Sequence, residues 1–163
     1  MRLKRVLFPI GMTLWAAVVN CNQAAPAAAL PEALRAHVKS EQFQMVTSLR
    51  GLPLGVRNEL GRLFGSYVLD IAEPGKPFEV TGTVGVSGLP IRRLIAAGCS
   101  YDHCLVYYER GGRSRTWKAA LLHWSPEATR LEGGGTAPGG LKTVEAVRTA
   151  VLSGAIKNSN SVW

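Results

Sequence analysis

The chain has 163 residues, of which 47% are hydrophobic and 18% charged, and its formal net charge is +8. This composition excludes a disordered or collagen-like protein. The length favours a single domain and excludes a multidomain enzyme and a polytopic membrane protein.

Residues 1–24 have the layout of a secretory signal peptide. Basic Arg2, Lys4 and Arg5 precede an apolar run of 14 residues at 6–19, and small residues follow it. As a helix this run would span about 21 Å, which is too short for a hydrocarbon core of about 30 Å. We therefore expect export rather than a transmembrane anchor, and a periplasmic or outer-envelope location.

The position of Cys21 leaves two cleavage schemes open. Residues 18–21 resemble a bacterial lipoprotein box, in which the cysteine is lipidated and becomes the mature N-terminus, although Val18 and Asn20 depart from the preferred residues. The other scheme is ordinary cleavage among the alanines that follow. In both schemes we expect an Ala/Pro tether at 25–30 and a single folded domain at 31–163.

Apolar residues at helical spacing predict two helices in the first part of this domain. One is expected over residues 30–49, although Gln42 interrupts its apolar stripe, and the other lies between a break at 51–53 and a stop at Gly65. The region up to residue 91 is less regular. It holds a β-prone segment and then an irregular or edge strand at 78–86, which glycines interrupt.

The C-terminal half has the signals of an antiparallel meander. Each β-prone run is bounded by turn-forming glycine, serine or proline residues, as hairpin-connected strands require. These runs predict strands at residues 92–97, 104–110, 115–124 and 128–132.

A glycine-rich stretch after residue 132 is expected to be a flexible connection to a final helix. Thr143 is the expected N-cap of this helix, and Gly154 lies beyond its end. Leu141 separates the last glycine from Lys142 and Thr143, so the spacing does not match a phosphate-binding loop. The predicted class is α+β: two N-terminal helices, a meander of about four or five strands and one C-terminal helix packed on the sheet. The helices are expected to cover one face of that sheet.

Two cysteines remain once Cys21 is removed or lipidated. In an oxidising compartment, Cys99 and Cys104 are expected to form a disulfide. The alternative is a metal site built from Cys99, Asp102, His103 and Cys104, which are all metal-ligand types. Export favours the disulfide, and we expect no metal ion and no other cofactor.

Tyr108, Arg113 and Arg115 are the candidate binding residues. The two arginines lie at the tip of the hairpin that follows residue 110, where guanidinium groups can bind carboxylates or phosphates. Strand alternation sends Tyr107 and Tyr108 to opposite faces, so we expect one of them to be exposed. The expected partner is an envelope protein or an anionic cell-surface polymer, not nucleic acid. Membrane contact is expected only through a lipid anchor on Cys21.

His103 and His123 are the candidate catalytic residues of an alternative interpretation. They lie on adjacent predicted strands and can approach each other, with Asp102 nearby as an acid. The chain has no G-x-S-x-G or H-E-x-x-H motif that would strengthen this interpretation. The favoured hypothesis is therefore an exported, non-catalytic binding domain. A small periplasmic hydrolase and a lipid-anchored envelope assembly factor are the alternatives.

Overall fold

A computed structural model describes residues 30–66, 68–81, 88–157 and 163. The expected signal peptide, Cys21 and most of the tether lie outside these residues. Within the described part, no helix is both long enough and apolar enough to span a bilayer.

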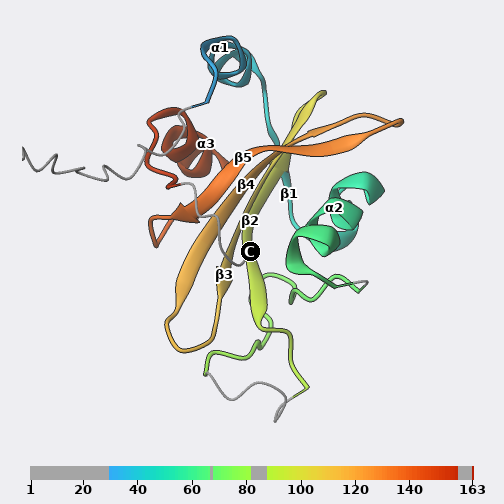
Figure 1. The fold of residues 1–163 in the computed structure, drawn as a ribbon, viewed down its shortest axis with the longest axis vertical. Helices are drawn as coiled ribbons and strands as arrows, with labels where there is room; N and C mark the ends of the chain where they lie inside the picture. The colour runs from blue at the N-terminus through green and yellow to red at the C-terminus, as the bar shows by residue number, and fades with distance from the viewer. Residues whose placement is uncertain (1–29, 67, 82–87, 158–162) are drawn as a thin grey trace, which may run out of the picture.

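A single antiparallel sheet organises the described chain (Figure 1). Its strand order is β1-β2-β3-β4-β5, so every strand pairs with its neighbours in the sequence, as a meander requires. The α+β class and the C-terminal helix on the sheet are thereby confirmed. The elements are α1 (Glu32–Ser40), β1 (Gln44–Val46), the 3-10 turn η1 (Leu49–Gly51), α2 (Leu54–Phe64), β2 (Arg92–Cys99), β3 (His103–Arg110), β4 (Thr116–Trp124), β5 (Thr129–Ala137) and α3 (Val144–Leu152).

The first N-terminal helix is shorter than the periodicity predicted. α1 ends at Ser40, and the following residues turn to form β1, whose Met45 is the register partner of Gly98 in β2. The edge of β2 offers backbone hydrogen bonds that a continued helix would leave unused, and this pairing outweighs the helical spacing. The second helix is confirmed as α2, which ends at Gly65 in the left-handed conformation with φ 67°.

Residues 68–81 form no strand of the sheet. Ala72 makes a single parallel bridge with Arg93, and Phe78 is buried beneath the Arg93 guanidinium, 4.5 Å from the ring centroid. A few backbone hydrogen bonds and side-chain contacts therefore hold this part of the expected irregular region. Most of the predicted strand at 78–86 lies outside the described residues.

Helices cover both faces of the sheet, so the expectation of one covered face is incomplete. In Figure 1, α2 lies on one side of the sheet and α1 and α3 lie on the other. The core under α2 includes Leu52, Val56, Leu60, Leu94, Val106, Tyr108 and Leu122. The core under α1 and α3 includes Val38, Leu105, Tyr107, Leu121, Val147 and Val151. Successive residues of β3 are therefore buried whichever face they point to.

The first part of the glycine-rich stretch, residues 133–137, belongs to β5 and is not a flexible connection. A Cβ atom on Gly134, whose φ is 154°, would lie 2.4 Å from the carbonyl oxygen of Ala119 in β4. Only glycine allows the two backbones to approach this closely. The final helix begins as predicted, because the Thr143 hydroxyl accepts a 3.1 Å hydrogen bond from the Ala146 amide.

Candidate metal centre

The end of the sheet where β3 begins and β4 ends carries a group of histidines and carboxylates. His37 lies on α1, and Glu41 is the C-cap of that helix. Asp102 lies in the turn between β2 and β3, and His103 begins β3. His123 lies on β4 and Glu132 on β5. The group comprises His37, Glu41, Asp102, His103, His123 and Glu132, and we call it the histidine–carboxylate cluster. It contains all three histidines of the chain.

The turn before β3 fixes the position of His103. Cys99 and Cys104 are register partners in β2 and β3 and are joined by a disulfide, which confirms the predicted bridge. Within the closed loop, Ser100 donates its amide to the His103 carbonyl at 2.7 Å and accepts the His103 amide on its hydroxyl at 3.0 Å. The alternative prediction of a metal site that uses both cysteine thiols is therefore wrong, because the two sulfur atoms are bonded to each other.

Carboxylates contact both ring nitrogens of His103. Glu41 Oε1 lies 2.9 Å from Nδ1, and Glu132 Oε2 lies 3.1 Å from Nε2 on the opposite side of the ring. His103 is only 2% exposed. A buried imidazole held on two sides in this way has a fixed orientation.

A β-bulge places Glu132 in this position. Leu121 pairs with Gly133, but the next residue, Leu122, pairs with Leu131, so Glu132 has no register partner on β4. Bulges redirect a side chain that regular alternation would place elsewhere. Arg130 then holds the carboxylate through a 2.6 Å hydrogen bond to the second oxygen, Oε1.

His37 forms the solvent side of the cluster. Its Nε2 lies 3.2 Å from Glu41 Oε1 and 3.1 Å from Asp102 Oδ2. About half of the His37 side chain, 48%, is exposed, whereas the side chains of His103 and Glu41 are buried. The cluster therefore has a buried floor and an open side through which a small ion can enter.

Three of these side chains have the spacing of metal ligands. One atom each from His37, Glu41 and His103 lie within 4.8 Å of one another. Ligand atoms of a tetrahedral zinc ion, with bonds of about 2.0 Å, are about 3.3 Å apart. The Glu41 oxygen is 2.9 Å from the His103 nitrogen and 3.2 Å from the His37 nitrogen, so a small shift of these side chains would accommodate the ion.

His123 belongs to the cluster but makes none of the hydrogen bonds described above. It is the register partner of His103, and the two rings pack edge to face with centroids 5.5 Å apart. Its Nδ1 is shielded from solvent and has no hydrogen-bond partner among the residues that the structure describes. The two histidines therefore approach each other, as strand adjacency indicated, but through ring packing.

The binding residues expected at the hairpin tip lie at the other end of the strands. Tyr108 is fully buried, so its assignment as an exposed binding residue is wrong; the sheet is covered on both faces and Tyr107 is buried as well. Arg115 lies 3.2 Å from the carboxylate of Glu109 and 5.8 Å from the Phe78 ring. Arg113 is exposed. Of the three expected binding residues, only Arg113 and Arg115 therefore lie at the surface.

No sequence pattern had singled out His37, Glu41 or Glu132 as members of this site. His37 and Glu41 are four residues apart, a spacing that places two side chains on one face of a helix and could have indicated a ligand pair. Glu132 has no such signal, because its position depends on the bulge and on a fold that brings it to a histidine 29 residues away.

Comparison with protein-family models, with curated proteins and with solved structures finds no match to this chain.

Proposed function

We propose that this protein is an exported binding domain that holds one zinc-type divalent metal ion on His37, Glu41 and His103. This replaces the expectation of no metal ion. Export is supported by the basic and apolar leader of the sequence, and by the disulfide, which is typical of oxidising compartments.

The contact between His103 and Glu132 carries the proposal. A histidine that ligates a metal through one ring nitrogen almost always donates its other ring N–H to a carboxylate or carbonyl. Here Glu41 and the proposed metal ion lie on the Nδ1 side of the His103 ring. On the other side, Glu132 Oε2 lies 3.1 Å from Nε2, within hydrogen-bond distance. The cluster thus contains ligands and also the outer carboxylate that orients one of them.

The ligand types select the class of ion. Two imidazole nitrogens and one carboxylate oxygen suit zinc and neighbouring transition metals, whereas calcium and magnesium prefer oxygen ligands alone. Three protein ligands leave a fourth position. Asp102 Oδ2 lies 3.1 Å from His37 Nε2, but Asp102 is not among the three side chains whose ligand atoms lie within 4.8 Å of one another.

The geometry favours binding over a metal-free hydrolase that uses His103 and His123. Both nitrogens of His103 already contact carboxylates, and the ring is buried, so neither nitrogen faces a substrate. A general base needs to reach the proton that it removes. Alanine at position 123 would abolish turnover in the hydrolase but would spare metal binding in the domain proposed here.

Calorimetric titration of the exported protein with zinc chloride tests the proposal. We expect one site per chain, and we expect Glu41→Gln and His37→Gln each to weaken binding by about tenfold or more. Glu32→Gln is the matched control, because Glu32 is an exposed carboxylate on the same helix, with 86% of its side chain exposed. Calcium and magnesium should give no binding heat. Absence of zinc binding, or equal affinities of the Glu32 and Glu41 variants, would show that the cluster is only a network of ion pairs.

A further inference from the structure

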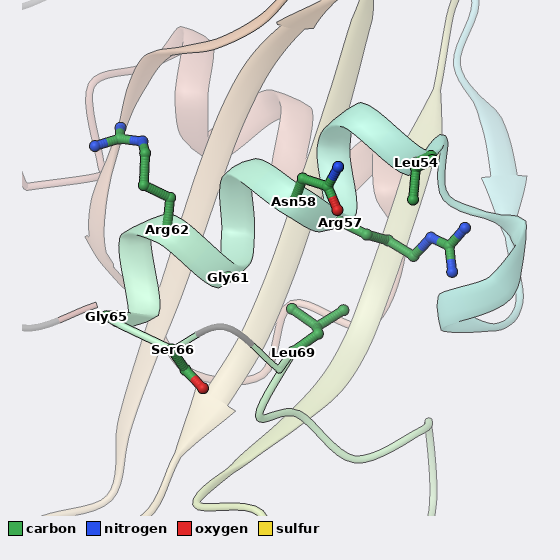
Figure 2. A pocket seen from close by; sticks show the side chains of 8 residues that line it. All are labelled: Leu54, Arg57, Asn58, Gly61, Arg62, Gly65, Ser66 and Leu69. Carbon is green, nitrogen blue, oxygen red and sulfur yellow. The ribbon is translucent and has the colours of Figure 1, made fainter.

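A cavity lies against α2, which packs on the opposite face of the sheet from α1 and the histidine–carboxylate cluster (Figure 2). Its volume is about 600 Å³, within the range of about 300–1,000 Å³ that is usual for small-molecule sites. Residues of α2 form one wall, and the segment that follows the helix forms another. This cavity has no part in the metal centre.

Glycines allow these two walls to lie close together. A Cβ atom on Gly61 would lie 3.1 Å from the carbonyl oxygen of Ser66, so a larger residue in α2 would push the following segment outwards. Gly65 makes the turn with a φ of 67°. Leu69 lies below the helix in Figure 2 and lines the cavity.

The lining combines apolar side chains with positive charge. Leu54 is 63% exposed at the start of α2, and Leu69 packs against the core under the helix. Two arginines, Arg57 and Arg62, also line the cavity, and its lining contains no acidic residue. A ligand that matches this surface has an apolar body and a negative group.

Arg57 is the arginine that is free to bind that group. Arg62 is already held by Glu59 through hydrogen bonds of 2.6 and 2.8 Å. Arg57 has no ion pair with any residue that the structure describes, and its Nε, shielded from solvent, has no hydrogen-bond partner. Figure 2 shows the Arg57 side chain extending to the right above Leu69, whereas the Arg62 side chain extends in the opposite direction near the C-terminal end of α2.

We infer that this cavity binds a long-chain fatty acid. The alkyl chain lies against Leu54 and Leu69, where apolar surface is removed from water. The carboxylate accepts hydrogen bonds from the Arg57 guanidinium, whose planar group matches a carboxylate in a bidentate pair. A neutral amphiphile lacks the charge that Arg57 requires, and a free inorganic anion lacks the apolar body.

Displacement of a fluorescent fatty acid from the full exported chain tests this inference. The probe is dansyl-undecanoic acid, whose emission rises in an apolar environment, and the competitors are hexadecanoic acid and hexadecanol. We expect the acid to displace the probe at a concentration about tenfold or more below that of the alcohol, as a charged hydrogen bond implies. Failure of the probe to bind, or equal displacement by acid and alcohol, would overturn the inference.

Matched variants locate the bound carboxylate. Arg57→Gln should weaken probe binding by about tenfold or more, whereas Lys142→Gln, at an exposed cation just before α3, should leave it unchanged. Leu54→Glu changes an exposed position and should also weaken binding, because it adds a negative charge beside the carboxylate. Equal binding by the Arg57 and Lys142 variants would overturn the site. None of these residues belongs to the metal centre, so zinc titration of the same variants remains an independent measurement.

Discussion

Arg148 of α3 donates a hydrogen bond from Nη1 to the backbone carbonyl of Glu41 at 2.9 Å. Its Nη2 donates to the carbonyl of Lys39 at the same distance. These carbonyls lie at the C-terminal end of α1, where a cation satisfies groups that the helix leaves unpaired. Arg148 therefore ties α1 to α3 and holds Glu41 beside His103.

Arg148→Ala should weaken zinc binding although it removes no ligand. The loss of two hydrogen bonds to a charged group should also lower the free energy of unfolding by about 1.5–3 kcal/mol. Zinc titration and urea unfolding measure the two effects, and Arg113→Ala is the exposed control. A loss of stability with unchanged zinc affinity would show that Arg148 has a structural role alone.

Glu132→Gln should lower zinc affinity by about 10–100-fold, as loss of an outer carboxylate does in other histidine metal sites. The amide keeps the shape of the side chain but removes the charge that faces His103 Nε2. Glu127→Gln, in the exposed turn before β5, is the control. If both variants bind zinc like the parent protein, Glu132 does not act through His103.

Replacing Cys99 and Cys104 together with serine should lower the free energy of unfolding by about 2 kcal/mol, from the entropy of the short loop that the bridge closes. The same change should weaken zinc binding, because Asp102 and His103 lie at the end of that loop. Urea unfolding and zinc titration of the double variant check both effects. If zinc affinity is unchanged without the disulfide, the disulfide does not position the residues of the metal centre.

The protein should lose stability above about pH 10, the ordinary pKa of tyrosine. Burial raises the pKa of Tyr107 and that of Tyr108 above this value. Their unfolded side chains ionise first, so the folded state binds more protons in this range; the stabilisation is complete below pH 10 and is lost as the pH rises. Urea unfolding between neutral pH and about pH 11 measures the slope, which Tyr108→Phe should reduce. Tyr101→Phe, at a side chain that is 91% exposed, should not reduce it.

Mass analysis of the native protein should show a chain that lacks residues 1–20 or more and has both remaining cysteines oxidised. An acyl group on Cys21 would distinguish the lipid-anchored form, and Cys21→Ser should then abolish labelling with radioactive palmitate. Retention of Met1 together with two titratable thiols would refute export.

The local signals in the sequence predicted the meander, the disulfide and both ends of the last helix. Turn residues, the N-cap of Thr143 and the short spacing of Cys99 and Cys104 act over a few residues, so neighbouring sequence is enough to recognise them. The first helix was predicted too long for the same reason. Its periodicity is local, whereas the strand that replaces it pairs with residues more than 50 positions away.

The sequence by itself determined an α+β domain with three helices and four hairpin-connected strands, because hairpin and cap signals are local; the fifth strand, β1, lies where a helix was predicted. Only the tertiary structure decided which side chains meet. His103 contacts Glu41 and Glu132 across 62 and 29 residues, and neither distance follows from a motif. Arg148 holds the C-terminal end of α1 and thereby positions Glu41, and the bulge in β5 positions Glu132. Tyr108 is buried because helices cover both faces of the sheet. These outcomes depend on long-range packing, which the spacing of residues along the chain does not record.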